Sequence, residues 1–204
     1  MQPVPNIVYL ASKSPRRRDL LKQIGVQYEL LLIREAAPRV DVDEAPRQDE
    51  TPHAYVERIV KLKTETALRV MRERKLTVRP ILTADTTVSV DDTILGKPAS
   101  TDDAAAMLRR LSGQTHQVLT AVMVTSDAGQ FKTLTTSFVT FASLSDNDIR
   151  RYVDTGEPMD KAGAYAVQGR AAQFIAKLSG SYSGVVGLPL YETTGLLKQA
   201  GLQI

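Results

Sequence analysis

The segment IVYLASKSPRRRDLL, residues 7–21, carries the clearest structural pattern in the chain. Its apolar first part, residues 7–11, predicts a short buried strand. Pro15 follows Ser14, and proline suits the first position of a helix because that position needs no N–H donor. Ser14 is then the expected N-cap, and apolar residues at helical spacing lead to a stop at Gly25. The stretch therefore predicts a strand, a tight loop and a helix whose first amides point back over the loop.

The start of this helix is a candidate anion site. Unpaired N–H groups and the helix dipole attract negative charge there. The loop and the first turn add Lys13, Arg16, Arg17 and Arg18. The alternative is a surface helix whose arginines are merely solvated.

Composition narrows the classes of function. The 204 residues are enough for one large domain or for two lobes that share a core. A net charge of +3 suits an anionic small ligand better than a long nucleic acid. The absence of cysteine excludes disulfides, thiolate zinc sites and a cysteine nucleophile, and two histidines, His53 and His116, make a histidine-rich metal centre unexpected.

No targeting or membrane segment is visible in the sequence. The first residues, MQPVPN, lack the basic and apolar regions of a secretory signal. No apolar run approaches the ~20 residues that a membrane span needs. We therefore expect a cytoplasmic protein with no membrane or nucleic-acid partner.

The rest of the chain mixes helical and strand patterns. Strands are predicted at 27–33, 80–90, 117–125, 133–141 and 173–178, and helices at 52–75, 101–111, 146–154 and from 189 onward. Thr51-Pro52 is expected to open the helix 52–75, and Thr101 and the Ser145/Asp148 capping box are the expected helix caps. Glycine-rich loops are predicted at 156–169 and 180–190. Helices mixed with hairpins, without a linker or repeat, indicate a single α/β domain over residues 1–204 with a mixed twisted sheet.

Two charged residues stand in apolar or β-branched surroundings. Asp85 interrupts a predicted strand, where a carboxylate costs stability unless it is paired, metal-bound or at an exposed end. Lys63 falls close to the apolar face of the predicted helix 52–75 and needs a partner for the same reason. Both are therefore candidates for a functional cluster.

Four ordered segments resemble the Maf family of nucleoside triphosphate pyrophosphatases. They are LASKSPRR at 10–17, ADTTV at 84–88, GKP at 96–98, and EPMDKAGAYAVQG at 157–169 followed by GSYSGVVGLPL. The resemblance covers nearly the whole chain. It implies an elongated, two-lobed α/β fold, related to that of the inosine triphosphate pyrophosphatases, with a central cleft. It also implies a homodimer that cleaves a nucleoside triphosphate to monophosphate and pyrophosphate with Mg²⁺ or Mn²⁺.

The resemblance also implies roles for individual residues. Asp85 matches the catalytic proton acceptor and would also bind the metal. The metal's second ligand is expected at Glu44, with Asp43 and Glu35 as alternatives, because the acidic loop 34–50 looks longer than the family's usual link. The expected substrate-binding residues are Ser12, Arg16, Arg17, Lys63, Thr86, Lys97 and Gln168. Of these, Arg16, Thr86 and Gln168 match the trio of the branch that prefers dTTP and UTP.

The chemistry of these residue types agrees with the resemblance. Arginine forks and lysine ammonium groups suit the charges of a triphosphate and of leaving pyrophosphate. Carboxylate oxygens and substrate phosphates are what magnesium and manganese prefer. The alternative function is a nucleotide-sensing regulatory protein, an inhibitor of septum formation, that binds in the same cleft with negligible turnover. An RNA-binding module is disfavoured because only 5% of the residues are aromatic.

Overall fold

The computed structural model describes residues 7–33, 35–36, 39–40 and 42–204, with side chains for 7–33 and 42–204. Its strands are β1 (Ile7–Leu10), β2 (Gln27–Leu30), β3 (Glu35–Ala36), β4 (Arg39–Val40), β5 (Ile81–Val90), β6 (Thr93–Leu95), β7 (Thr115–Ser126), β8 (Gly129–Phe141) and β9 (Ile175–Ser179). Its α-helices are α1 (Pro15–Gln23), α2 (Pro52–Glu73), α3 (Thr101–Leu111), α4 (Asp146–Val153), α5 (Tyr182–Val186) and α6 (Leu190–Gln199). Three 3₁₀ turns cover Glu157–Asp160, Ala162–Ala164 and Arg170–Phe174.

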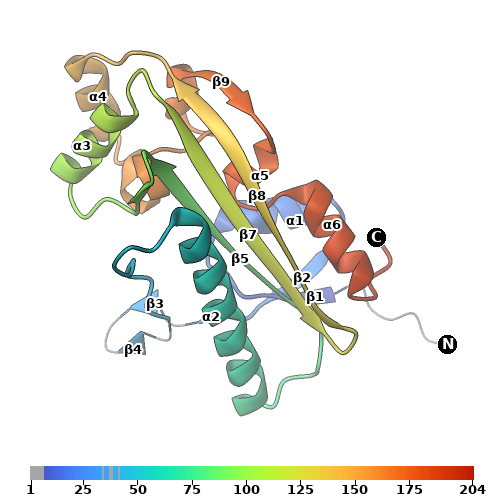
Figure 1. Ribbon diagram of the computed structural model, residues 1–204. Helices are drawn as coiled ribbons and strands as arrows, with labels where there is room; N and C mark the ends of the chain where they lie inside the picture. The colour runs from blue at the N-terminus through green and yellow to red at the C-terminus, as the bar shows by residue number, and fades with distance from the viewer. Residues whose placement is uncertain (1–6, 34, 37–38, 41) are drawn as a thin grey trace.

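A seven-stranded sheet runs through the molecule in the order β2-β1-β5-β7-β8-β9, and β6 pairs with β5 (Figure 1). β1 is parallel to both of its neighbours, whereas the other pairs are antiparallel. The short β3 and β4 strands form a separate ladder. The predicted mixed sheet is confirmed.

Helices cover both faces of the sheet because side chains along a strand alternate between them. On one face, α2 packs Val56 and Ile59 against Leu119 and Ala121 of β7. On the other face, α1, α5 and α6 share a core with β1, β5 and β7, which includes Leu82. A third cluster joins α3 and α4 to the far ends of the long strands, so that the molecule is elongated (Figure 1).

The edge of β5 changes partner in its middle, and this change makes room for a cleft. β1 pairs with β5 only as far as Leu82, and β6 pairs with β5 from Val88 onward. Among the described residues, no strand covers that edge of β5 between these two positions. The carboxyl end of β1 opens beside the same gap, which is where α/β sheets commonly bind ligands.

The helix ends differ from the sequence predictions at three places. Ser14 occupies the N-cap position of α1, but its side chain makes no capping bond. The cap of α3 is Ser100 and not Thr101, because the Ser100 hydroxyl accepts from the Asp103 amide at 3.1 Å. The predicted loop 180–190 contains α5, which Ser181 caps. The helix start at Thr51-Pro52 and the capping box at Ser145/Asp148 are confirmed, and the Thr51 hydroxyl accepts from the Ala54 amide.

Candidate functional site

A cleft of about 680 Å³ opens at the gap beside β5. Segments from both ends of the molecule line it: the loop after β1, the middle of α2 and β5, the turn after β6, and the loops before β9 and α6. The side chains predicted from the sequence all lie on its walls: Ser12, Arg16, Arg17, Glu44, Lys63, Asp85, Thr86, Lys97 and Gln168. Residues up to 156 positions apart in the sequence therefore meet in one space.

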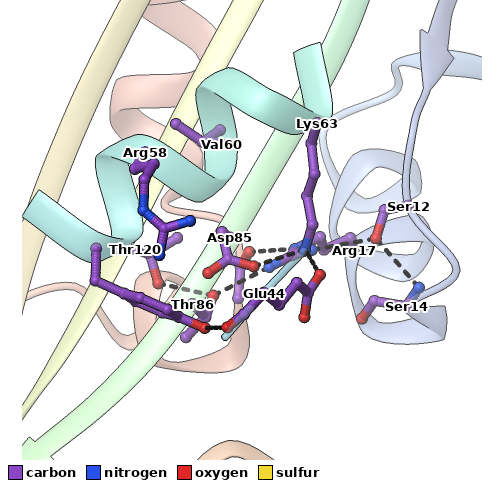
Figure 2. Close-up of polar contacts among 12 residues, drawn as sticks. Ser12, Ser14, Arg17, Glu44, Arg58, Val60, Lys63, Asp85, Thr86 and Thr120 are labelled. Atoms are coloured by element: carbon purple, nitrogen blue, oxygen red, sulfur yellow. Dashed lines mark hydrogen bonds and ion pairs between the residues drawn. The ribbon is translucent and has the colours of Figure 1, made fainter. Parts of the chain in front are cut away.

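Lys63 joins two carboxylates at the floor of the cleft. Its Nζ lies 2.7 Å from Asp85 Oδ1 and 2.7 Å from Glu44 Oε1 (Figure 2). α2 supplies the lysine, and β5 supplies Asp85 from the face that α2 covers. Taken as whole residues, Lys63 and Asp85 are each only 8% exposed. The two charged residues that stood out in the sequence are therefore each other's partners.

Electrostatic attraction within this cluster outweighs the cost of burial. Burial disfavours the charged Lys63 ammonium, but Asp85 and Glu44 reverse the effect and raise the lysine's pKa. Burial likewise disfavours the Glu44 carboxylate, but Lys63 lowers its pKa below the ordinary value. The lysine and Glu44 are therefore charged at neutral pH.

The loop that carries Glu44 is fastened to α2. The Tyr55 hydroxyl donates to the Glu44 carbonyl at 2.9 Å. Arg58 bonds Glu50 through Nε at 2.6 Å and donates to the Ala45 carbonyl at 3.0 Å. These contacts place the Glu44 carboxylate in the cleft.

Asp43, one of the two alternative acids for the metal site, does not reach this cluster. Asp43 is exposed and accepts from the Ala45 amide at 3.0 Å. The side chain of Glu35 lies outside the described residues. Of the two acids whose side chains are described, Glu44 and not Asp43 contacts Lys63.

The donor set suits a metal that arrives with its substrate. Among the described residues, no group of three or more histidine, cysteine or acidic side chains could hold an ion. Mg²⁺, however, is usually bound by one or two carboxylates together with substrate phosphates. Asp85 and Glu44 supply two carboxylates, each with one oxygen bonded to Lys63. The residues present therefore fit a shared, incomplete site.

Arg17 ties three segments together beside this cluster. Its Nε donates to the Gly187 carbonyl at 2.8 Å, its Nη1 to Ser12 Oγ at 3.1 Å and its Nη2 to Thr86 Oγ1 at 3.1 Å (Figure 2). The side chain is buried. A planar guanidinium is suited to this because it holds several acceptors in fixed directions. The structure thus gives Arg17 a clear role in shaping the cleft wall.

The rim carries the more exposed predicted residues. Lys97 and Gln168 are exposed and Arg16 is half-buried. Burial raises the pKa of Asp160. Lys161 and Arg16 lower it by more, so that the pKa lies below its ordinary value. Arg16 is therefore close enough to Asp160 to act on it electrostatically.

Cationic side chains dominate the cleft. Among the side chains that the structure describes, six cations line it, Lys13, Arg16, Arg17, Lys63, Lys97 and Lys161, against the three acids Glu44, Asp85 and Asp160. Such an excess attracts a highly charged anion.

Sequence reasoning missed some residues that build this cleft. Lys161 and Tyr165 line it from the glycine-punctuated loop 156–169, and Gly187 lines it from the loop after α5. The charged residues of the loop 156–169 could have indicated Lys161 from the sequence. Gly187 has a positive φ of 129°, which favours glycine, and its carbonyl accepts from Arg17 Nε at 2.8 Å. The contact between Gly187 and Arg17 could not be recognised from the sequence alone.

The chain is similar to proteins of known family. The family described as Maf-like protein matches residues 7–200. A dTTP/UTP pyrophosphatase from Cupriavidus metallidurans is 55% identical over 97% of this chain and 98% of its own length. One from Nitrosomonas europaea is 51% identical over 99% of this chain and 98% of its own length.

A solved structure, that of the Staphylococcus aureus Ham1 protein, aligns with a TM-score of 0.47 at 17% identity, covering 82% of this chain and 90% of that one. The family match spans almost every described element and the cleft between them. The chain belongs to the Maf family.

Proposed function

We propose that this protein hydrolyses nucleoside triphosphates, dTTP and UTP above all, to the monophosphate and pyrophosphate. Relatives that carry the name dTTP/UTP pyrophosphatase match it at 51–55% identity over nearly their full length. The observation that carries the proposal is the Lys63 cluster with Asp85 and Glu44 at the floor of a cationic cleft. Carboxylates for water activation and cations for phosphates are what this hydrolysis needs.

The cations of the cleft hold the phosphates in this proposal. An ammonium group has three N–H donors, and the two carboxylates occupy two of those of Lys63. The third is available for a phosphate oxygen. Lys97 and Arg16 on the rim would neutralise the charge that develops on leaving pyrophosphate.

Asp85 accepts the proton of the attacking water in this scheme. Lys63 holds the carboxylate at 2.7 Å, which fixes its direction toward the cleft. Asp85 and Glu44 would hold a divalent ion, Mg²⁺ or Mn²⁺. Such an ion, when bound, polarises the phosphoryl group and lowers the pKa of a bound water.

Gln168 would select the base. Its amide offers one donor group and one acceptor, and uracil and thymine present a carbonyl beside an N3–H. Ala166 and Val167 line the cleft next to it and offer small apolar surface for a pyrimidine ring. Cytosine reverses part of this hydrogen-bonding pattern, so that a site built for uracil leaves polar groups unpaired.

A pyrophosphate-release assay over a panel of nucleotides, with Mg²⁺ or Mn²⁺, tests the proposal. We expect dTTP and UTP to be hydrolysed fastest, CTP more slowly and purine triphosphates poorly. Asp85→Asn keeps the size of the side chain, so folding should survive while turnover falls at least ~10²-fold, the usual scale for a lost general base. Near-wild-type turnover of this variant would remove Asp85 from the mechanism.

The same assay decides between the enzyme and the alternative, a nucleotide-sensing regulator. Tight nucleotide binding with no pyrophosphate release by the wild-type protein would favour the regulator. We further propose that the protein is a cytoplasmic homodimer. Size-exclusion chromatography with light scattering measures its mass in solution and tests the dimer. Each helix in the described part of the chain is too short or too polar to cross a bilayer.

A further inference from the structure

Thr120, a residue of β7 that is not part of the cleft wall, is hydrogen-bonded to Thr86, which is. Its hydroxyl lies 3.0 Å from that of Thr86, which it faces directly across the β5–β7 ladder (Figure 2). Its own hydroxyl donates to the Gly184 carbonyl at 2.8 Å. Thr120 is fully buried, whereas Thr86 is half-buried and lines the cleft.

The direction of each hydrogen bond in this group follows from a count of protons. The Gly184 carbonyl can only accept, so the single hydroxyl proton of Thr120 is used there. Thr120 can then only accept from Thr86, which donates its own single proton. Arg17 Nη2 donates to the Thr86 oxygen at 3.1 Å and occupies one of its two lone pairs.

We propose that Thr120 fixes Thr86 as a hydrogen-bond acceptor toward the cleft, so that the bound nucleotide must present a donor there. Only one lone pair of the Thr86 hydroxyl is left for a ligand. Without Thr120, the Thr86 hydroxyl could turn its proton toward the ligand and accept either polarity. Thr120 is therefore a positioning residue for selectivity. This inference rests on the proposed function of the cleft.

Two groups of a pyrimidine nucleotide could supply the donor. One is the N3–H of uracil or thymine, which cytosine lacks, and Thr86 would then share this proton with the Gln168 amide oxygen. The other is a hydroxyl of the sugar, which a 3′-deoxy analogue lacks at that carbon. The kcat/KM ratios UTP:CTP and UTP:3′-deoxy-UTP distinguish these sources.

Thr120→Val removes the hydroxyl and keeps the shape. We expect one of the two ratios to fall about tenfold, the scale of one hydrogen bond of about 1.4 kcal/mol. Thr120→Ser keeps the hydroxyl and should restore that ratio. Thr135→Val is the matched control, because its hydroxyl donates only to the Thr120 backbone carbonyl, at 3.3 Å. It should leave both ratios unchanged.

Both ratios within twofold of wild type in folded Thr120→Val would overturn the inference. If that variant fails to fold, Thr86→Val takes its place, since it removes the acceptor itself and should lower the same ratio. Unchanged ratios in Thr86→Val would likewise overturn the inference. If the wild-type protein releases no pyrophosphate, the proposed function fails instead, and the same ratios are then measured as equilibrium dissociation constants.

Discussion

Replacing Lys63 by methionine tests the charged cluster at the floor of the cleft. Methionine keeps the apolar stem and removes the ammonium that Asp85 and Glu44 share. Removing one partner of a buried ion pair typically costs about 3–5 kcal/mol. The Asp85 side chain is 12% exposed but that of Glu44 is 36% exposed, so water relieves part of the cost. We therefore expect about 3 kcal/mol of lost stability, or ~6–12 °C in Tm for a chain of this length.

Thermal unfolding followed by circular dichroism, first in EDTA and then with Mn²⁺, measures this effect without any turnover. The variant leaves two carboxylates without their cation, so the metal should stabilise it more than it stabilises the wild type. A metal at 100 times its Kd adds about 2.7 kcal/mol. Lys61→Met is the matched control, because Lys61 lies on the same helix, is exposed, and reaches Glu65 only at 3.9 Å. It should unfold as the wild type does.

Two results would contradict this role of Lys63. A Lys63→Met protein with the wild-type Tm in EDTA would show that the cluster does not stabilise the fold. Equal rises in Tm with Mn²⁺ in both proteins would show that the metal does not use these carboxylates.

Three further predictions follow from residues outside this cluster. Lys97→Met should weaken binding of the triphosphate at least tenfold more than that of the monophosphate, by calorimetry; equal losses would separate Lys97 from the β and γ phosphates. Gln168→Glu should reduce the preference for UTP over CTP more than it lowers kcat, and an unchanged preference would rule out Gln168 as the base reader. Burial lowers the pKa of His116 to about 4 from 6.5, so only the unfolded chain gains its proton between these values. Stability should therefore fall by about 3 kcal/mol as the pH drops from 6.5 to 4. His116→Gln should flatten this part of a urea-unfolding profile, and an identical pH dependence in both proteins would contradict it.

Much of this site could be predicted from sequence because charge is conspicuous in an apolar pattern. Asp85 within a β-branched strand and Lys63 near an apolar helix face each required a partner, and the structure pairs them. The choice of Glu44 over Asp43 could not be derived in this way. It depends on how Arg58 and Tyr55 fasten the loop to α2, and neither contact leaves a periodic signal.

Thr120 shows the opposite case. In sequence it is one threonine within a run of β-branched and apolar residues, as expected for any buried strand. Its importance depends on the register that sets it opposite Thr86 and on the approach of Gly184 from a segment 64 residues away. The local sequence pattern predicts neither this register nor the approach of Gly184. The predicted cap at Thr101 was wrong for a related reason, since a cap depends on the path of the chain as well as on residue type, and Ser14 holds its N-cap position without a side-chain bond.

The bond from Arg17 to the Gly187 carbonyl spans 170 positions of the chain. A ribosome adds about 5–20 residues each second, so Arg17 emerges roughly 10–30 s before its partner is made. During that interval the nascent polypeptide has the strand, the loop and the arginine, but not the segment that fixes their arrangement. Contacts between distant positions also form late when a finished chain folds. The cleft is thus completed only near the end of synthesis, and fragments that end before α5 would display the basic residues without a working pocket.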